Sequence, residues 1–185
     1  MKSSKSFHDM TEDELLQLVR KGRSDAYGEV FTRHREKAFA LAFQYLHNYE
    51  DAKDVIQDAF IKAYRKFSRF DLSRKFGPWL LTIVRNQCID AIRRRKRTAA
   101  QELTPVLPDK RALRADKAVL RREVWAGLQQ LNPEHREIIF LKDYQGHSYV
   151  EIAEILGIPL GTVMSRLHHA RRNLAAQLRE RASVS

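Results

Sequence analysis

The segment from Ser148 to Arg172 is the part of the sequence that most restricts the fold. It reads SYVEIAEILGIPLGTVMSRLHHARR. Ser148 and Glu151 have the spacing of a capping box, which predicts the start of a helix. Gly157 is the residue type expected just after a helix ends, where the backbone needs a positive φ. Apolar residues then recur at helical spacing from Val163. The pattern predicts two helices joined by a tight turn, which is a helix-turn-helix.

The second of these helices is basic on the side expected to face solvent. In a helix-turn-helix, the first turns of the second helix enter the major groove of DNA. Arginine can pair with guanine or phosphate there, and hydroxyl side chains suit phosphate oxygens. An ordinary helical hairpin with a basic solvated face is the alternative. The expected outward positions are Leu160, Thr162, Met164, Ser165, Arg166, His168, His169, Arg171 and Arg172.

The net charge favours a partner that is a polyanion. The chain has 34 Lys and Arg against 23 Asp and Glu in 185 residues, a formal net charge of +11. The charge is unevenly distributed, because residues 93–97 are five consecutive cations, whereas Glu50, Asp51, Asp54 and Asp58 form a local acidic patch. Clustered cations are typical of nucleic-acid binding. A solvated helix face is the other interpretation.

Helical periodicity dominates the rest of the chain, so an all-α fold is expected. Residues 98–118 break the pattern with two prolines and few large apolar residues, which predicts a flexible linker between two small helical domains. Cys88 is expected to face the core. Helices are predicted to start at the capping box of Thr11 and Glu14, at a cap on Ser24, and at Asn132 with Pro133. A third helix is predicted from about Tyr49 to Phe67, a loop over 68–76, and a fourth helix from Gly77 to about Arg97.

Several function classes are disfavoured by what the sequence lacks. A single cysteine excludes a disulfide framework and a cysteine-based zinc site. There is no apolar run of about 18 residues and no secretory signal, so we expect a cytoplasmic protein without membrane insertion of its own. His168 and His169 point about 100° apart on a helix, which disfavours a shared metal. No phosphate loop or activated nucleophile is recognisable, so we expect neither an enzyme nor a cofactor.

Two segments carry a close resemblance to a known family. EDAKDVIQDAFIKAYRKFSRFDLSRKFGPWLLTIVRNQCIDAIRRRKR resembles region 2, and LNPEHREIIFLKDYQGHSYVEIAEILGIPLGTVMSRLHHARRNL resembles region 4, of the extracytoplasmic-function sigma factors of bacterial RNA polymerase. The resemblance implies a four-helix region 2 domain over residues 1–97, a linker over 98–118 and a helix-turn-helix region 4 domain over 119–185. It implies a subunit that guides core polymerase to promoters and helps to melt the minus-10 DNA.

The resemblance also assigns residues. Asp54, Gln57 and Asp58 match the positions that bind the clamp helices of the large polymerase subunit. The loop from Arg69 to Phe76 matches the one that captures a flipped base, which calls for stacking surfaces and cations. Phe70 and Phe76 are expected to be exposed there, while Tyr64, Phe67 and Trp79 sit at helical spacing and are expected in the core. The expected minus-10 contacts are Arg69, Phe70, Arg74, Lys75, Phe76, Arg85, Asn86 and Arg93.

The helix-turn-helix would read the minus-35 element and lie near the flap of the polymerase. Met164 replaces a lysine that is frequent in the family, and Gly77 with Pro78 replaces residues that are usually polar. An anti-sigma factor is a further implied partner. A stand-alone regulator that binds operator DNA as a dimer is the alternative function. The expected minus-35 contacts are Thr162, Met164, Ser165, Arg166, His169, Arg171 and Arg172.

Overall fold

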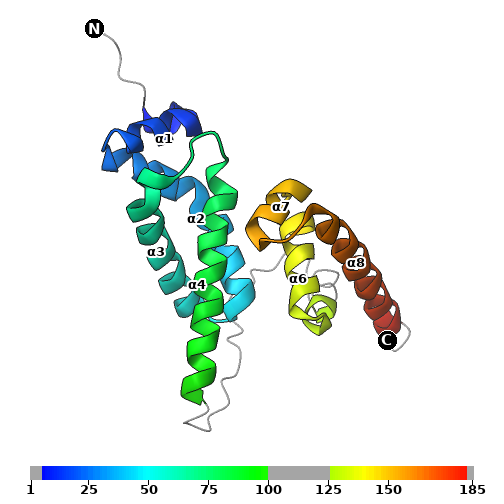
Figure 1. The fold of residues 1–185 in the computed structure, drawn as a ribbon. Coiled ribbons are helices and arrows are strands. Elements are labelled where there is room, and N and C mark those ends of the chain that lie inside the picture. The colour runs from blue at the N-terminus through cyan, green and yellow to red at the C-terminus, as the bar shows by residue number, and fades with distance from the viewer. Residues whose placement is uncertain (1–5, 100–125, 183–185) are drawn as a thin grey trace. The chain divides into compact units, whose positions relative to one another are not determined.

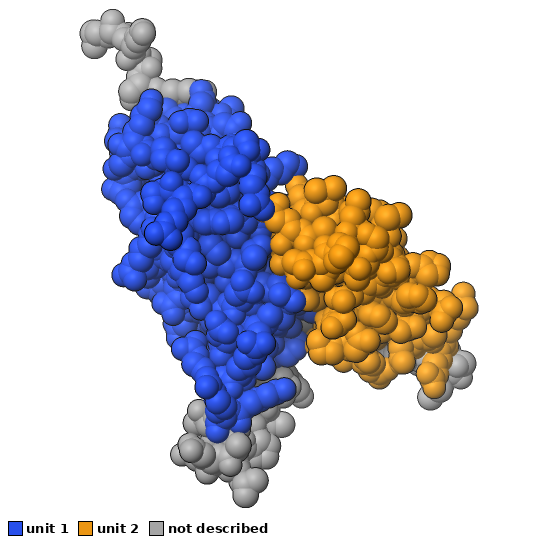
Figure 2. All heavy atoms as spheres, in the orientation of Figure 1, with its two compact units in different colours: residues 1–111 blue, residues 112–185 orange. Residues whose placement is uncertain are grey.

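The computed structural model describes residues 6–99 and 126–182, and these residues form helices and connecting turns without a strand (Figure 1). The chain divides into two compact units, residues 1–111 and residues 112–185 (Figure 2). The expected all-α, two-domain fold class is therefore confirmed. The boundary between the units falls inside the predicted linker over 98–118, most of which lies outside the described residues.

Unit 1 is built on three long helices that pack against one another. These are α2 (Ser24–Leu46), α3 (Tyr49–Lys66) and α4 (Phe76–Ala99), and α1 (Glu12–Arg20) packs on α2 (Figure 1). Two short 3-10 turns, η1 (Phe7–Asp9) and η2 (Phe67–Arg69), precede α1 and follow α3. The core contains the stripe Val55, Ile56, Ala59, Phe60 and Ala63 of α3 with apolar residues of α2 and α4, including Cys88, which is fully buried as predicted.

Local hydrogen bonds explain where the helices of unit 1 begin. At α1 the amide of Glu14 donates to Thr11 Oγ1 at 3.2 Å and the amide of Thr11 donates to Glu14 Oε2 at 2.7 Å, so the predicted capping box is confirmed. The side chain of Asn48 caps α3. The predicted cap at Ser24 is wrong, because Ser24 is already inside α2 and no side chain caps that helix.

Unit 2 contains the predicted helix-turn-helix. Residues 126–130 are helical, followed by α6 (Pro133–Ile139), one π-helical turn η3 (Phe140–Tyr144), α7 (Tyr149–Leu156) and α8 (Leu160–Ala182). Ser148 and Glu151 form the second capping box. Gly157 ends α7 with φ +66°, the conformation for which glycine was expected. Val163, Leu167 and Ala170 of α8 are buried and pack the second helix onto the unit.

Candidate nucleic-acid interfaces

The acidic face of α3 is open to solvent. Asp54, Gln57 and Asp58 are exposed, and their spacing of three and four residues places them on one side of the helix. Ile61, one turn further along, is 43% exposed, although it is apolar. An apolar side chain beside two free carboxylates suits a partner with a basic surface, because the charges attract and the apolar contact removes area from water.

The loop between α3 and α4 differs from the expectation in one respect. Phe70 is 3% exposed and Phe76 is fully buried, so the prediction that their rings are exposed is wrong. Phe76 is the first residue of α4, and Phe70 packs against that end of the helix. The ring centroids of Phe70 and Phe76 lie 4.7 Å and 5.5 Å from that of Trp79. Phe67 is buried as expected, whereas Tyr64, expected in the core, is 42% exposed.

With the rings turned inward, the charged groups on the outer surface of this loop are three cations and the carboxylate of Asp71. Arg69, Arg74 and Lys75 are exposed. The backbone of the loop is anchored to α1, because the guanidinium of Arg20 donates a hydrogen bond to the carbonyl oxygen of Phe70. The backbone amide of Ser73 donates to the Asp71 carboxylate at 2.9 Å and holds the pKa of Asp71 below its usual value. The loop can therefore offer positive charge to a nucleic-acid backbone from a fixed scaffold.

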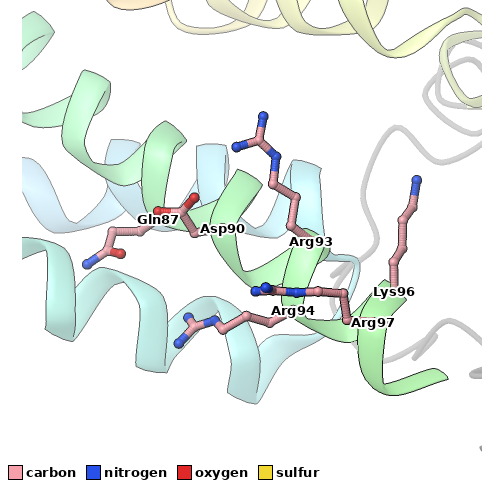
Figure 3. Close-up of a pocket in the computed structure, with 6 residues that line it drawn as sticks. All are labelled: Gln87, Asp90, Arg93, Arg94, Lys96 and Arg97. Carbon is pink, nitrogen blue, oxygen red and sulfur yellow. The ribbon is translucent and has the colours of Figure 1, made fainter. Parts of the chain in front are cut away.

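The C-terminal end of α4 adds a basic groove. A cavity of about 690 Å³ is lined by Gln87, Asp90, Arg93, Arg94, Lys96 and Arg97 (Figure 3). On the preceding turns Asn86 is exposed and Arg85 is half-buried. Sequence reasoning selected only Arg93 from this group, although the run of five cations over residues 93–97 was a usable signal. Successive helical residues point about 100° apart, so the run alone does not show which cations share a face.

Arg95 is the member of this run that serves the fold. Its guanidinium forms an ion pair with Asp51 of α3, which joins the end of α4 to the start of α3. Asp51 belongs to the acidic patch found in the sequence. The structure thus separates that patch into a carboxylate used internally and the exposed pair Asp54 and Asp58.

In α8, the predicted DNA-facing residues divide into two groups. Ser165, His169 and Arg172 are exposed, Met164 is 55% exposed, and Thr162 is half-buried. His168 is exposed as well, with its ring 5.5 Å from that of His169. These residues form the outer face of α8.

Arg166 and Arg171 are instead engaged by carboxylates of their own unit. Arg166 Nη2 lies 3.0 Å from Glu134 Oε2 of α6, and its side chain is only 21% exposed, so the expectation of an outward Arg166 is wrong in part. Arg171 makes a two-pronged contact with Asp143, and its Nε donates to Asp143 Oδ2 at 3.1 Å. This contact raises the pKa of Arg171 above its usual value.

The described residues contain neither a cluster of metal-ligating side chains nor a membrane-spanning helix. Residues 6–99 and 126–182 contain no group of three or more His, Cys, Asp or Glu placed to hold a metal ion. Within the same part of the chain, no helix is both long enough and apolar enough to cross a membrane.

Comparisons with known proteins identify the two units. The family Sigma-70 region 2 matches residues 30–98, and the family Sigma-70, region 4 matches residues 121–174. The ECF RNA polymerase sigma factor SigW of Bacillus subtilis is 34% identical over 180 residues, covering 89% of this chain and 95% of the relative. SigM of Mycobacterium tuberculosis is 34% identical, covering 92% of this chain and 86% of the relative.

Solved structures agree with this assignment. The sigma factor RpoE of Bartonella quintana, in complex with the anti-sigma factor NepR, has a TM-score of 0.72 at 26% identity and covers 83% of this chain and 96% of its own. CnrH, in complex with the cytosolic domain of CnrY, has a TM-score of 0.70 at 28% identity, with coverages of 91% and 97%.

The chain therefore belongs to the sigma-70 family, in its extracytoplasmic-function group. It is an RNA polymerase sigma factor that directs promoter-specific transcription, and the stand-alone regulator is not favoured.

Proposed function

We propose that this sigma factor binds core polymerase through the acidic face of α3, with Asp54, Gln57 and Asp58 against the clamp helices of the large subunit. The observation that carries the proposal is that these three residues are all exposed on one side of a helix inside the region 2 match. Ile61 extends the same face by one turn, and its apolar side chain would add contact area to the interface.

Region 2 is also proposed to hold the melted minus-10 DNA. Arg69, Arg74 and Lys75 would contact phosphates around the loop, and Asn86 with Arg93 would continue the contact along α4. Melting costs a few kcal/mol for each unstacked step, roughly, and cationic contacts to the separated strands offset part of that cost. The buried rings of Phe70 and Phe76 would act by shaping the loop rather than by stacking on a base.

Region 4 is proposed to read the minus-35 element with α8 and to lie near the flap of the polymerase. Ser165, His169 and Arg172 are exposed on the helix that a helix-turn-helix inserts into the major groove. Thr162 at the start of α8 would contact phosphate, and Met164 would offer an apolar contact to a thymine methyl group.

Regulation by an anti-sigma factor is part of the proposal. Two of the solved structures that this chain resembles are complexes of a sigma factor with such a partner or with a cytosolic partner domain. We expect an equivalent partner to occlude the polymerase-binding or DNA-binding faces. The protein would act in the cytoplasm, where polymerase and DNA are, and would itself perform no chemical reaction.

Charge reversal on α3 tests the polymerase contact. Asp58→Arg is expected to abolish co-elution with bacterial core polymerase while far-ultraviolet circular dichroism stays unchanged, because the side chain is exposed. Glu36→Arg is the matched control, since Glu36 is an exposed carboxylate on α2. Co-elution of Asp58→Arg at the wild-type level would reject the assigned face.

Promoter function is tested by transcription from a genomic fragment library with core polymerase, with and without the protein. New transcript starts that share two upstream elements are expected. Direct DNA binding by the protein without any new start would favour an operator-binding regulator instead.

A further inference from the structure

Two acidic residues in unit 2 occupy the guanidinium groups that would otherwise be free for DNA. Glu134 lies in the first turn of α6 and holds Arg166, while Asp143 lies in η3 and holds Arg171. Arg166 and Arg171 are five positions apart, which corresponds to about 140° around a helix. The two ion pairs therefore lie on different sides of α8 and flank its outer face.

Both ion pairs can be broken at little cost. The side chains of Arg166 and Glu134 are 21% and 67% exposed, and those of Arg171 and Asp143 are 49% and 40% exposed. Ion pairs at such exposure contribute little to stability, because water and salt screen them. A DNA phosphate offers the same guanidinium a charge-assisted hydrogen bond together with counterion release. At each pair, the protein carboxylate and a DNA phosphate therefore compete for the same guanidinium group.

We propose that Glu134 and Asp143 limit the affinity of the DNA-binding unit for DNA, because they compete with DNA phosphates for Arg166 and Arg171. This inference rests on the proposed function, in which α8 binds DNA. The competition weakens binding to a duplex of any sequence, since phosphate contacts carry no sequence information. Contacts from the outer face, at Ser165, His169 and Arg172, then account for a larger share of the binding free energy.

The test measures binding of the full-length chain to a labelled duplex of arbitrary sequence by fluorescence anisotropy, from 50 to 300 mM KCl. Glu134→Gln and Asp143→Asn are each expected to lower Kd about two- to fivefold at the lowest salt. Each is also expected to steepen the slope of log K against log salt, by up to about 0.9 for one regained phosphate contact.

The matched control is Asp13→Asn. Asp13 is the second residue of α1, as Glu134 is the second residue of α6, and the substitution changes the net charge equally. Its Kd should stay within twofold of the wild-type value. Glu134→Ala and Asp143→Ser serve as second variants, and thermal unfolding by circular dichroism verifies that each protein is folded.

Arginine variants separate failure of this inference from failure of the proposed function. Arg166→Gln and Arg171→Gln should weaken DNA binding, and the gain from Glu134→Gln should disappear in the Arg166→Gln background. If the arginine variants weaken binding but the carboxylate variants leave Kd unchanged or raise it, the competition is refuted and the DNA-binding face stands. If the arginine variants have no effect, both the inference and this part of the DNA-binding face are refuted.

Discussion

Replacing Phe76 with alanine tests whether the loop of region 2 is built on a buried aromatic cluster. The ring of Phe76 is fully buried, and its centroid lies 5.2 Å from that of His34, 5.5 Å from Trp79 and 5.7 Å from Phe70. A buried phenylalanine removes roughly 200 Å² from water, which at about 25 cal/mol/Å² gives an upper bound of about 5 kcal/mol. With the cavity that remains, Phe76→Ala should lower the free energy of unfolding of unit 1 by about 3–5 kcal/mol.

The assay is urea unfolding followed by the fluorescence of Trp79, which lies beside Phe76. The only other tryptophan in the sequence is Trp125, so a Trp125→Phe background reports on unit 1 alone. For a slope of roughly 1.5 kcal/mol/M, the midpoint should fall by about 2–3 M. Phe76→Leu, which keeps most of the volume, should cost about 1.5 kcal/mol or less and provides a measurable variant if the alanine protein is unfolded.

Ile61→Ala is the control, because Ile61 is 43% exposed in the same unit and should cost about 1 kcal/mol or less. The decisive alternative is a Phe76→Ala protein with an unchanged urea midpoint and a weakened affinity for single-stranded minus-10 DNA. That result would place the ring on the surface, as the sequence pattern suggested, and would refute the buried cluster.

Three further predictions concern single side chains. Gly157→Ala should destabilise unit 2 by about 1–2 kcal/mol in thermal unfolding, because Gly157 has φ +66°, which alanine adopts at a cost. Gly161→Ala, in α8 with open space around it, should not destabilise unit 2. Equal losses in the two variants would contradict the effect of the positive φ. His34 Nε2 lies 3.3 Å from Glu12 Oε1 and lowers the pKa of this carboxyl below its usual value, so the stabilisation that the contact gives unit 1 is present at neutral pH and is lost as the pH falls through the lowered pKa. Glu12→Gln should therefore flatten the acid limb of a pH–stability curve, and an unchanged curve would exclude this carboxylate as a cause. The Cys88 thiol should resist a thiol reagent in the native protein and react once urea unfolds it, and rapid native reaction would contradict its complete burial.

Several of the positions at which helices begin and end were predictable from the sequence. The capping boxes at Thr11 and Ser148 and the glycine at position 157 act through hydrogen bonds and backbone angles within three or four residues, so the residue types alone indicate them. The predicted cap at Ser24 was wrong because α2 begins one residue earlier than the prediction required. Ser24 is then inside the helix, and its side chain does not cap it. The helix-turn-helix and the exposed α3 face follow from periodicity, which is also a local property.

The burial of aromatic rings and the ion pairing of arginines were decided by the tertiary structure, because both depend on partners that are distant in the chain. Phe70 and Phe76 lie in a segment without periodicity, so sequence spacing could not show that Trp79 and His34 complete a buried cluster around them. Arg166 and Arg171 have outward positions by spacing, yet Glu134 and Asp143 meet them from helical segments that precede the helix-turn-helix. The sequence by itself thus determined which segments are helical and where they end, because those choices are made by neighbouring residues. The packing of helices determined which aromatic rings are buried and which arginines are neutralised, because burial and ion pairing depend on contacts across the fold.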